Sequence, residues 1–264
     1  MNEGESVILC EGYYDRAFWA AWLEHLGCTD PGRRPGSSAR LSVLDPWGSE
    51  VKGKGQYAYN SKSGKFVRIF PCDGKGNVVR EMRNRLAEDR DRLAQHASRP
   101  RLARLVVSVD PDIDAHGTPI ATGLRHEDLH ALLRKYDPSA AETEDDDTAL
   151  FGGATLVSLV RWEAGDSPMP GLPKTQTLER LVCAALVAAY PRRGPAVQTW
   201  LDSRPDGPDA GPKEFGWSHM AGWYAQRGCQ DFYKAVWEDG PVVNELRSRL
   251  TQCGAWRIAQ ALAK

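Results

Sequence analysis

Short apolar runs alternate with amphipathic stretches over the first 160 residues, and this alternation predicts an α/β fold. The runs at 6–10 and 105–109 are apolar except for Ser6 and Ser108. Such runs are typical of central strands in a parallel sheet, because both faces of these strands are buried. The run at 154–160 indicates one more strand. Residues 16–23, and a later segment that ends near Gln95, have the periodicity of amphipathic helices.

Two further segments predict a β-hairpin between these helices. Residues 56–60 and 65–70 are rich in aromatic and β-branched side chains, and the polar stretch between them ends in glycine. Strands of this kind joined by a short loop commonly pair as a hairpin. We therefore expect a hairpin inserted near residues 50–70.

From residue 161 onward the pattern becomes helical, with interruptions rich in proline and glycine. The segment 175–190 is strongly apolar with polar residues at its start, as in a buried helix. We expect an α/β core at 1–160 and a helical region at 161–264 that packs on it. The expected core is a mostly parallel sheet with helices on both faces.

The strand predicted at 105–109 ends in three alternating acids, Asp110, Asp112 and Asp114. Open α/β sheets bind their ligands beyond the C-terminal ends of the strands. Clustered carboxylates repel one another, so a cation is needed to hold them together. Mg²⁺ and similar hard ions prefer oxygen ligands. The motif therefore predicts a metal site, with an exposed acidic turn as the alternative.

The strand predicted at 6–10 also runs into acids. Glu11 stands at its tip, Gly12 permits a tight turn, and Asp15 lies in the first turn of the following helix. A carboxylate at that position is also favoured by the helix dipole, which is the structural alternative for Asp15.

These two acidic strand ends together resemble the TOPRIM domain, the metal-binding module of topoisomerases, primases and several nuclease families. The family pattern is an apolar strand ending in Glu-Gly, an aspartate four residues after the glutamate, and a later strand ending in Asp-x-Asp. The resemblance implies a Rossmann-like sheet with a divalent metal site. A calcium EF-hand loop starting at Asp110 fits less well, since it needs glycine and glutamate where Ala115 and Ala121 stand.

A turn before the second long helix is similar to a Gly-Lys-x-Asn turn in nucleases of the OLD type (overcoming lysogenization defect). In this chain the turn consists of Gly74, Lys75, Gly76 and Asn77. Backbone N–H groups and a lysine in such a turn can bind a phosphate. A helix cap with permissive glycines is the alternative.

Two later residues extend the resemblance to OLD-type nucleases. Thr177-Leu178-Glu179 is similar to a Ser-x-Glu element of that family, which implies Glu179 as a further metal ligand. Lys213 is the best match to a lysine that approaches the scissile phosphate. Ordinary helix-start residues are the alternative for both. No Gly-x-x-x-x-Gly-Lys-Ser/Thr sequence is present, so we expect no counterpart of the ATPase half of OLD proteins.

Composition bears on the partners and the cellular compartment that we expect for this protein. The net charge of −1 does not suggest a general nucleic-acid binder. Arginines are frequent between Arg80 and Arg104, and acids are interleaved with them. This pattern predicts an exposed helix with i,i+4 ion pairs. The alternative is a helix face that binds the phosphates of a nucleic acid. Six separated cysteines without a Cys-x-x-Cys pair indicate free thiols in a reducing cytoplasm and no zinc site. No apolar run suits a membrane span, and no signal peptide is visible.

The resemblance implies a divalent-metal-dependent nuclease that hydrolyses phosphodiester bonds of DNA or RNA, in anti-phage defence or nucleic-acid processing. Two Mg²⁺ or Mn²⁺ ions are expected. Lys213 would neutralise charge on the phosphoryl group, and Glu11 could also serve as general acid or base. The implied metal ligands are Glu11, Asp15, Asp110, Asp112, Asp114 and Glu179.

Two other functions fit the same motifs. The chain could be a non-catalytic or conditionally activated subunit that binds a partner ATPase, or a nucleotidyl-transfer enzyme of the primase kind. Expected partners are DNA or RNA, with an ATPase protein or a second copy of this chain as further candidates. The sequence does not distinguish DNA from RNA, endonuclease from exonuclease, or one metal from the other.

Overall fold

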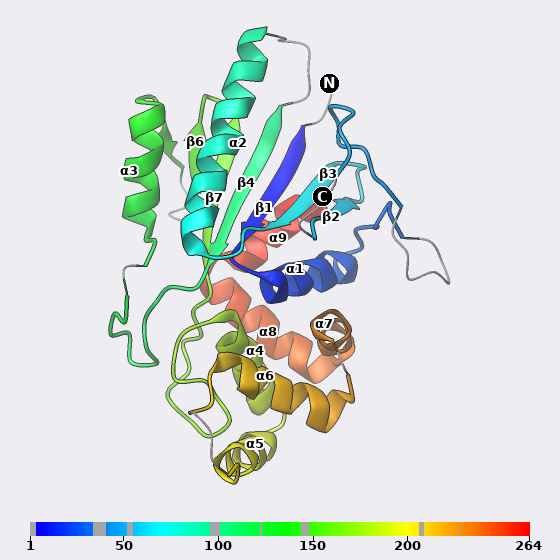
Figure 1. The fold of residues 1–264 in the computed structure, drawn as a ribbon, viewed down its shortest axis with the longest axis vertical. Coiled ribbons are helices and arrows are strands. Elements are labelled where there is room, and N and C mark those ends of the chain that lie inside the picture. The colour runs from blue at the N-terminus through cyan, green and yellow to red at the C-terminus, as the bar shows by residue number, and fades with distance from the viewer. Residues whose placement is uncertain are drawn as a thin grey trace. The chain divides into compact units, whose positions relative to one another are not determined.

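The chain forms two compact units, seen in a computed structural model that describes residues 4–33, 41–51, 55–95, 101–121, 123–143, 148–205, 209–226 and 228–264 (Figure 1). The first unit consists of 1–109, 125–160 and 257–264, and the second of 110–124 and 161–256. This division differs from the expected boundary at 160 in two places. The acidic segment 110–124 belongs with the helices, and the last eight residues belong with the sheet.

Within the described residues, seven strands form one sheet in the order β2-β3-β1-β4-β7-β6-β5. Their bounds are β1 Glu5–Cys10, β2 Tyr57–Asn60, β3 Phe66–Pro71, β4 Leu102–Val109, β5 Ala141–Glu142, β6 Thr148–Phe151 and β7 Thr155–Arg161. At the centre, β1 is parallel to both β3 and β4. The pairs β2–β3, β5–β6 and β6–β7 are antiparallel. The structure thus confirms a mixed α/β fold with parallel central strands.

Helices cover both faces of the central strands. Every residue of β1 and β3 is buried, and since side chains alternate between faces, neither face is open to water. Helix α1 (Tyr13–His25) packs on β2 and β3, and α2 (Lys75–Gln95) packs on β1 and β4. In Figure 1, α2 crosses in front of the strands and α9 (Ala255–Ala263) lies behind them. Helix α3 spans His126–Tyr136.

The predicted hairpin forms, with β2 antiparallel to β3. It is not a mere insertion, because β3 also pairs with β1 and is buried between β2 and β1 in the sheet. The i,i+4 pattern predicted for α2 is confirmed for Arg85, whose Nε lies 3.0 Å from the Glu81 carboxylate. Residues 96–100 of the arginine-rich stretch lie outside the described residues.

Tryptophans of α1 anchor this helix to the sheet. Trp19 and Trp22 are fully buried and stack with ring centroids 5.0 Å apart. The Trp19 Nε1 donates a hydrogen bond of 3.1 Å to the Ser108 hydroxyl on β4. The helix that follows Glu11 is therefore fixed against the strand that precedes Asp110.

The second unit is helical. Its elements are α4 Leu178–Ala189, α5 Arg193–Asp202, α6 Pro212–His219, the π-helix η1 Met220–Tyr224, α7 Cys229–Glu238 and α8 Gly240–Gln252. Helix α4 is the core of this unit, since it packs against α5, α6 and α8. The expected helical C-terminal region is thus confirmed. None of the helices in the described part of the chain is both long and apolar enough to cross a membrane.

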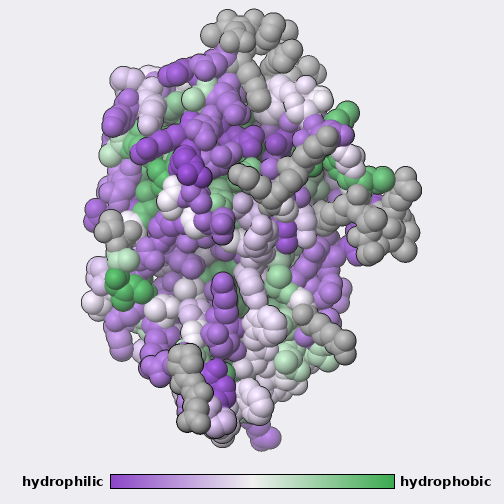
Figure 2. All heavy atoms as spheres, viewed as in Figure 1, coloured by the Kyte–Doolittle hydropathy of each residue, from purple (hydrophilic) through white to green (hydrophobic). Residues whose placement is uncertain are grey.

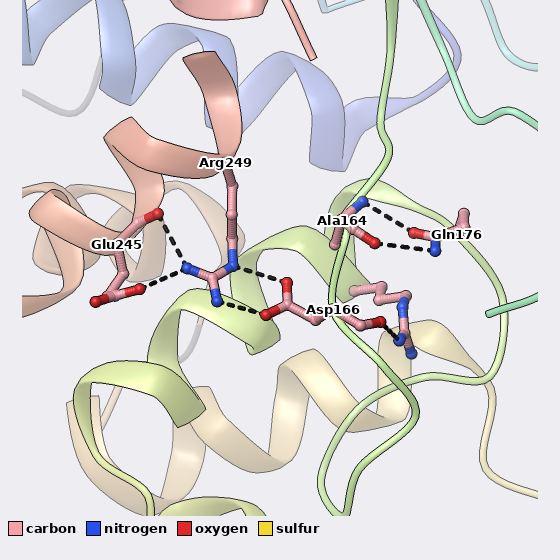
Figure 3. A network of polar contacts seen from close by, with 6 residues as sticks. Ala164, Asp166, Gln176, Glu245 and Arg249 are labelled. Atoms are coloured by element: carbon pink, nitrogen blue, oxygen red, sulfur yellow. Dashed lines mark hydrogen bonds and ion pairs between the residues drawn. The ribbon is translucent and has the colours of Figure 1, made fainter. Parts of the chain in front are cut away.

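A polar network holds the segment that leads into α4 (Figure 3). The Asp166 carboxylate accepts hydrogen bonds of 2.9 and 2.6 Å from the Arg249 guanidinium. The Gln176 amide forms two hydrogen bonds, of 2.9 and 3.0 Å, with the backbone of Ala164. The start of α4 therefore has a defined position within this unit. Hydrophilic residues prevail on the face drawn in Figure 2, and apolar ones are scattered.

Candidate functional site

The parallel register brings three strand ends to one edge of the sheet. In β1, Cys10 is level with Pro71 of β3 and with Ser108 of β4. Glu11 follows Cys10 in the chain, and Asp110 follows the last residue of β4. The two acidic motifs thus begin at neighbouring strand ends, as expected for a ligand site in an α/β sheet.

Glu11 lies against the glycine-lysine turn that follows β3. Its carbonyl oxygen accepts a hydrogen bond of 2.8 Å from the Gly74 N–H. Its carboxylate lies 3.8 Å from the Lys75 ammonium, and both side chains are about one-fifth exposed. The turn predicted to bind phosphate is therefore next to the first predicted metal ligand.

Backbone geometry explains the residues of this turn. Asp73 and Gly74 have left-handed φ angles of 59° and 106°, and the second value requires glycine. The Asn77 side chain donates a hydrogen bond of 2.8 Å to the Asp73 carbonyl, and so stabilises the turn. A Cβ added at Gly76 would meet no atom within 4 Å, which leaves room above the first turn of α2.

Asp15, in the first turn of α1, caps the start of this helix. Its carboxylate accepts a hydrogen bond of 3.2 Å from the Gly12 N–H. The turn does not use the conformational freedom of glycine, because Gly12 is extended, with φ −147° and ψ −174°, a conformation open to any residue. Asp15 therefore has a structural role whether or not it binds a metal.

In the second unit, Asp110 lies at the N-terminus of α4. Its Oδ1 accepts a hydrogen bond of 3.2 Å from the Leu178 N–H. The side chain of Thr177 caps the same helix, accepting from the Arg180 N–H at 3.2 Å. The start of α4 therefore lies at the first acid of the motif, Asp110. A negative charge here is also favoured by the helix dipole.

The loop that carries Asp112 and Asp114 is paired with the chain just before α4. The Ala115 N–H donates to Lys174 O at 2.7 Å, and the Gln176 N–H donates to Ile113 O at 2.9 Å. Asp112 has a left-handed φ of 56°. The loop thus forms one structure with the residues leading to Glu179.

Asp114 stabilises the tip of this loop. Its Oδ1 accepts hydrogen bonds of 2.8 Å from the backbone N–H groups of His116 and Thr118. These N–H groups, that of Thr118 first, hold the pKa of the Asp114 carboxyl below its usual range. One oxygen of this predicted ligand is therefore already engaged in a turn.

Glu179 and Lys213 lie in the same part of the second unit. Burial raises the pKa of the half-buried Glu179 carboxyl, and the charge of Lys213 acts in the opposite direction. A Cβ added at Gly216 of α6 would lie 3.7 Å from the Glu179 Cγ, so these helices pack closely. Lys213 itself is exposed, in the first turn of α6.

A cavity of about 610 Å³ borders Asp114 in the second unit. Its wall is mostly apolar, with Met169 and Phe215 among the lining residues, and it includes the polar side chains of His116, Lys174 and Gln198. No sequence motif marks Lys174, Gln198 or Phe215, because they come from a loop and two helices that are far apart in the chain.

The predicted metal ligands are distributed over both units. Glu11 and Asp15 belong to the first, and Asp110, Asp112, Asp114 and Glu179 to the second. Among the described residues, no three or more His, Cys, Asp or Glu side chains are grouped so as to hold a metal ion. The donors are all carboxylates, which suits Mg²⁺ or Mn²⁺. Burial raises the pKa of the adjacent Cys10 thiol well above its usual value, so this group stays neutral.

Comparison with known proteins identifies a similar fold without a function. No protein-family model matches the chain, and no curated protein sequence matches it. The crystal structure of a hypothetical protein from Pyrococcus horikoshii OT3 is similar, with a TM-score of 0.67 and 14% sequence identity. The match covers 99% of this chain and 100% of the archaeal chain. At this identity the similarity concerns the fold alone.

Proposed function

We propose that this protein is a divalent-metal-dependent nuclease of the TOPRIM kind, which hydrolyses phosphodiester bonds of DNA or RNA. The observation that carries the proposal is the parallel pairing of β1 with β4, level at Cys10 and Ser108. Each strand runs within two residues into an acid. Acids at neighbouring strand ends repel one another, and a bound cation would offset that repulsion.

Carboxylates from both motifs are the proposed ligands of two Mg²⁺ or Mn²⁺ ions, namely Glu11, Asp15, Asp110, Asp112, Asp114 and Glu179. When bound, such ions activate the attacking water and stabilise the leaving oxygen. Lys75 and the N–H groups of its turn would hold a non-bridging phosphate oxygen. Lys213 would offset the negative charge that develops on the phosphoryl group.

The surroundings of Glu179 support this assignment. Burial makes its ionised form costly, and a bound cation would compensate that cost. We further propose that the enzyme works in the cytoplasm, where its six cysteines remain free thiols. The resemblance of its motifs to those of OLD-type nucleases suggests testing the protein in anti-phage defence, together with a partner ATPase.

Cleavage assays test the proposal. The purified protein is incubated with labelled DNA and RNA in Mg²⁺, in Mn²⁺ or in chelator. We expect cleavage only with metal, and its loss in Glu11→Gln and in Asp110→Asn. Full activity in both variants, with folding unchanged, would rule out the proposed site.

A matched control separates catalysis from helix capping. Asp128 caps α3 as Asp15 caps α1, accepting from the Arg125 N–H at 3.1 Å. Asp128→Asn removes a capping carboxylate outside both acidic motifs and should cleave like the wild type. Asp15→Asn should lose activity. Equal activity of the two variants would mean that Asp15 only caps α1 and does not bind a metal.

A further inference from the structure

An arginine lies between two tyrosines on the surface of the first unit. The Arg16 guanidinium carbon is 4.9 Å from the centroid of the Tyr13 ring and 4.1 Å from that of the Tyr57 ring. The Tyr13 side chain is 51% exposed. A cation over an aromatic ring is attracted by the ring's electron density, so the three side chains stabilise one another as a stack.

Close packing holds this stack in place. The Arg16 Nη1 donates a hydrogen bond of 2.6 Å to the carbonyl oxygen of Gly55. A Cβ at Gly55 would lie 2.5 Å from that Nη1 and 2.9 Å from the Tyr13 ring, and the residue has a left-handed φ of 64°. Glycine at this position therefore lets the backbone rest directly on the stack. The exposed ring is fixed before any ligand arrives, which lowers the entropy cost of binding.

The position of Tyr13 points to a role in binding. It is the first residue of α1, two residues after Glu11 and two before Asp15. The buried side chains of α1 run from Ala17 to Leu23 and do not include it. Its exposed ring contributes little to the core, yet it lies at the sheet edge where the acidic motif begins.

We propose that the stack of Tyr13, Arg16 and Tyr57 is a platform for one nucleobase of a single-stranded nucleic acid. This inference rests on the proposed nuclease function and names its substrate form. Stacking of a base on an aromatic side chain contributes about 1–3 kcal/mol and tolerates any sequence, because every base has a flat face. In a duplex that face is already stacked on neighbouring bases. The platform therefore selects unpaired strands or frayed ends, and Arg16 adds attraction to the phosphates.

Binding is measured in chelator, so that cleavage plays no part. The probe is a single strand of roughly 12 nucleotides carrying 5-iodouracil, compared with the same strand in a duplex. We expect tighter binding of the single strand by fluorescence anisotropy. Tyr13→Ala should weaken it roughly 5- to 100-fold, whereas Tyr13→Phe keeps the ring and should bind like the wild type. Irradiation should cross-link the probe to the peptide that contains Tyr13.

Tyr136 offers a matched control. This tyrosine is also exposed, and the guanidinium of Arg83 lies 5.9 Å from its ring centroid, but it ends α3 and follows no acidic strand. Tyr136→Ala should bind the single strand like the wild type. Equal weakening in Tyr136→Ala and Tyr13→Ala, or a cross-link confined to other peptides, would overturn the platform.

The outcomes separate this inference from the proposed function. Metal-dependent cleavage that requires Glu11, together with wild-type binding by Tyr13→Ala, would overturn the platform alone. Selective single-strand binding and a cross-link at Tyr13, without cleavage under any metal, would uphold the platform and overturn the nuclease. Equal affinity of the wild type for duplex and single strand would overturn the proposed substrate form.

Discussion

The predicted acids of the first unit and those of the second have different surroundings. Glu11 belongs to a strand end set by sheet register, and its carboxylate is 3.8 Å from the Lys75 ammonium. Asp110 and Asp114 instead accept hydrogen bonds from backbone N–H groups of their own unit. We therefore expect that Glu11 can change with little effect on the fold, whereas Asp15 also caps α1. In the second unit, the same chemistry is tied to the start of α4 and to a turn.

The largest expected effect contrasts Glu11 with Asp114. Glu11→Gln should lower the rate of cleavage by more than about 100-fold, since loss of a residue that only supports metal ligands already costs about 10- to 100-fold. Asp114→Asn should lower it less, because one oxygen of this carboxylate already serves the turn. Turnover at saturating metal measures both, and urea unfolding provides the control for Glu11→Gln. A greater loss in Asp114→Asn would reverse the comparison between the units.

The units should also respond to pH in opposite directions, beginning with Glu5 in the first. Arg68 lies 2.5 Å from Glu5 and 2.8 Å from Asp45, so one guanidinium serves two buried carboxylates. Burial raises the pKa of Glu5 to about 7 from 4.5, and the folded state therefore holds its proton more tightly than the unfolded state. Protonated Glu5 therefore stabilises the folded state fully below pH 4.5. This stabilisation is lost as pH rises through about 7, which lowers the free energy of unfolding by roughly 3 kcal/mol.

Glu5→Gln tests this contribution, since glutamine cannot ionise. Urea unfolding of the wild type and the variant across that pH range gives the difference in free energy. We expect Glu5→Gln to gain stability relative to the wild type as pH rises. A constant difference between the two proteins would show that Arg68 keeps Glu5 ionised throughout.

In the second unit His219 should do the reverse. It is fully buried, its Nε2 lies 3.3 Å from the Gly171 carbonyl oxygen, and burial lowers its pKa to about 4 from 6.5. The unfolded chain therefore takes up a proton first. Stability is complete above pH 6.5 and falls as pH drops toward 4, again by roughly 3 kcal/mol. In His219→Gln, the free energy of unfolding should fall less between pH 6.5 and 4. An unchanged fall would mean that other groups cause it.

The smallest effect concerns the fold contribution of Asp110. Asp110→Ala removes the acceptor for the Leu178 N–H and should destabilise the protein by about 1 kcal/mol. Asp110→Asn retains an oxygen acceptor and should lose less. Thermal unfolding of both variants measures the difference. Equal stability of Asp110→Ala and the wild type would mean that this carboxylate serves only its ligand.

Much of the first unit could be predicted from local pattern. Apolar runs identified β1, β4 and β7, and the hairpin at β2 and β3 followed from aromatic and β-branched segments. Strands of this kind bury both faces, so their sequences carry a strong signal. The antiparallel strand β6 was not anticipated, since four residues next to an acidic stretch give little periodicity.

Only part of the candidate site could be predicted from the sequence. The acids stand out because each follows an apolar run, and the turn after β3 follows from the glycine at position 74. The sequence could not predict that residues 110–124 belong to the helical unit, because this depends on backbone pairing with residues 174–176. Backbone hydrogen bonds between distant segments leave no mark in side-chain type.

The sequence by itself therefore determined the α/β class, the central strands and the acids at their ends, because burial and turn chemistry act locally along the chain. Only the tertiary structure decided which groups those acids meet. The contact of Asp110 with Leu178, the proximity of Glu179 to Lys213 and the packing of Gly55 on the Tyr13 stack each join segments separated by tens of residues. Such contacts arise from the packing of whole elements against one another, which no short stretch of sequence encodes.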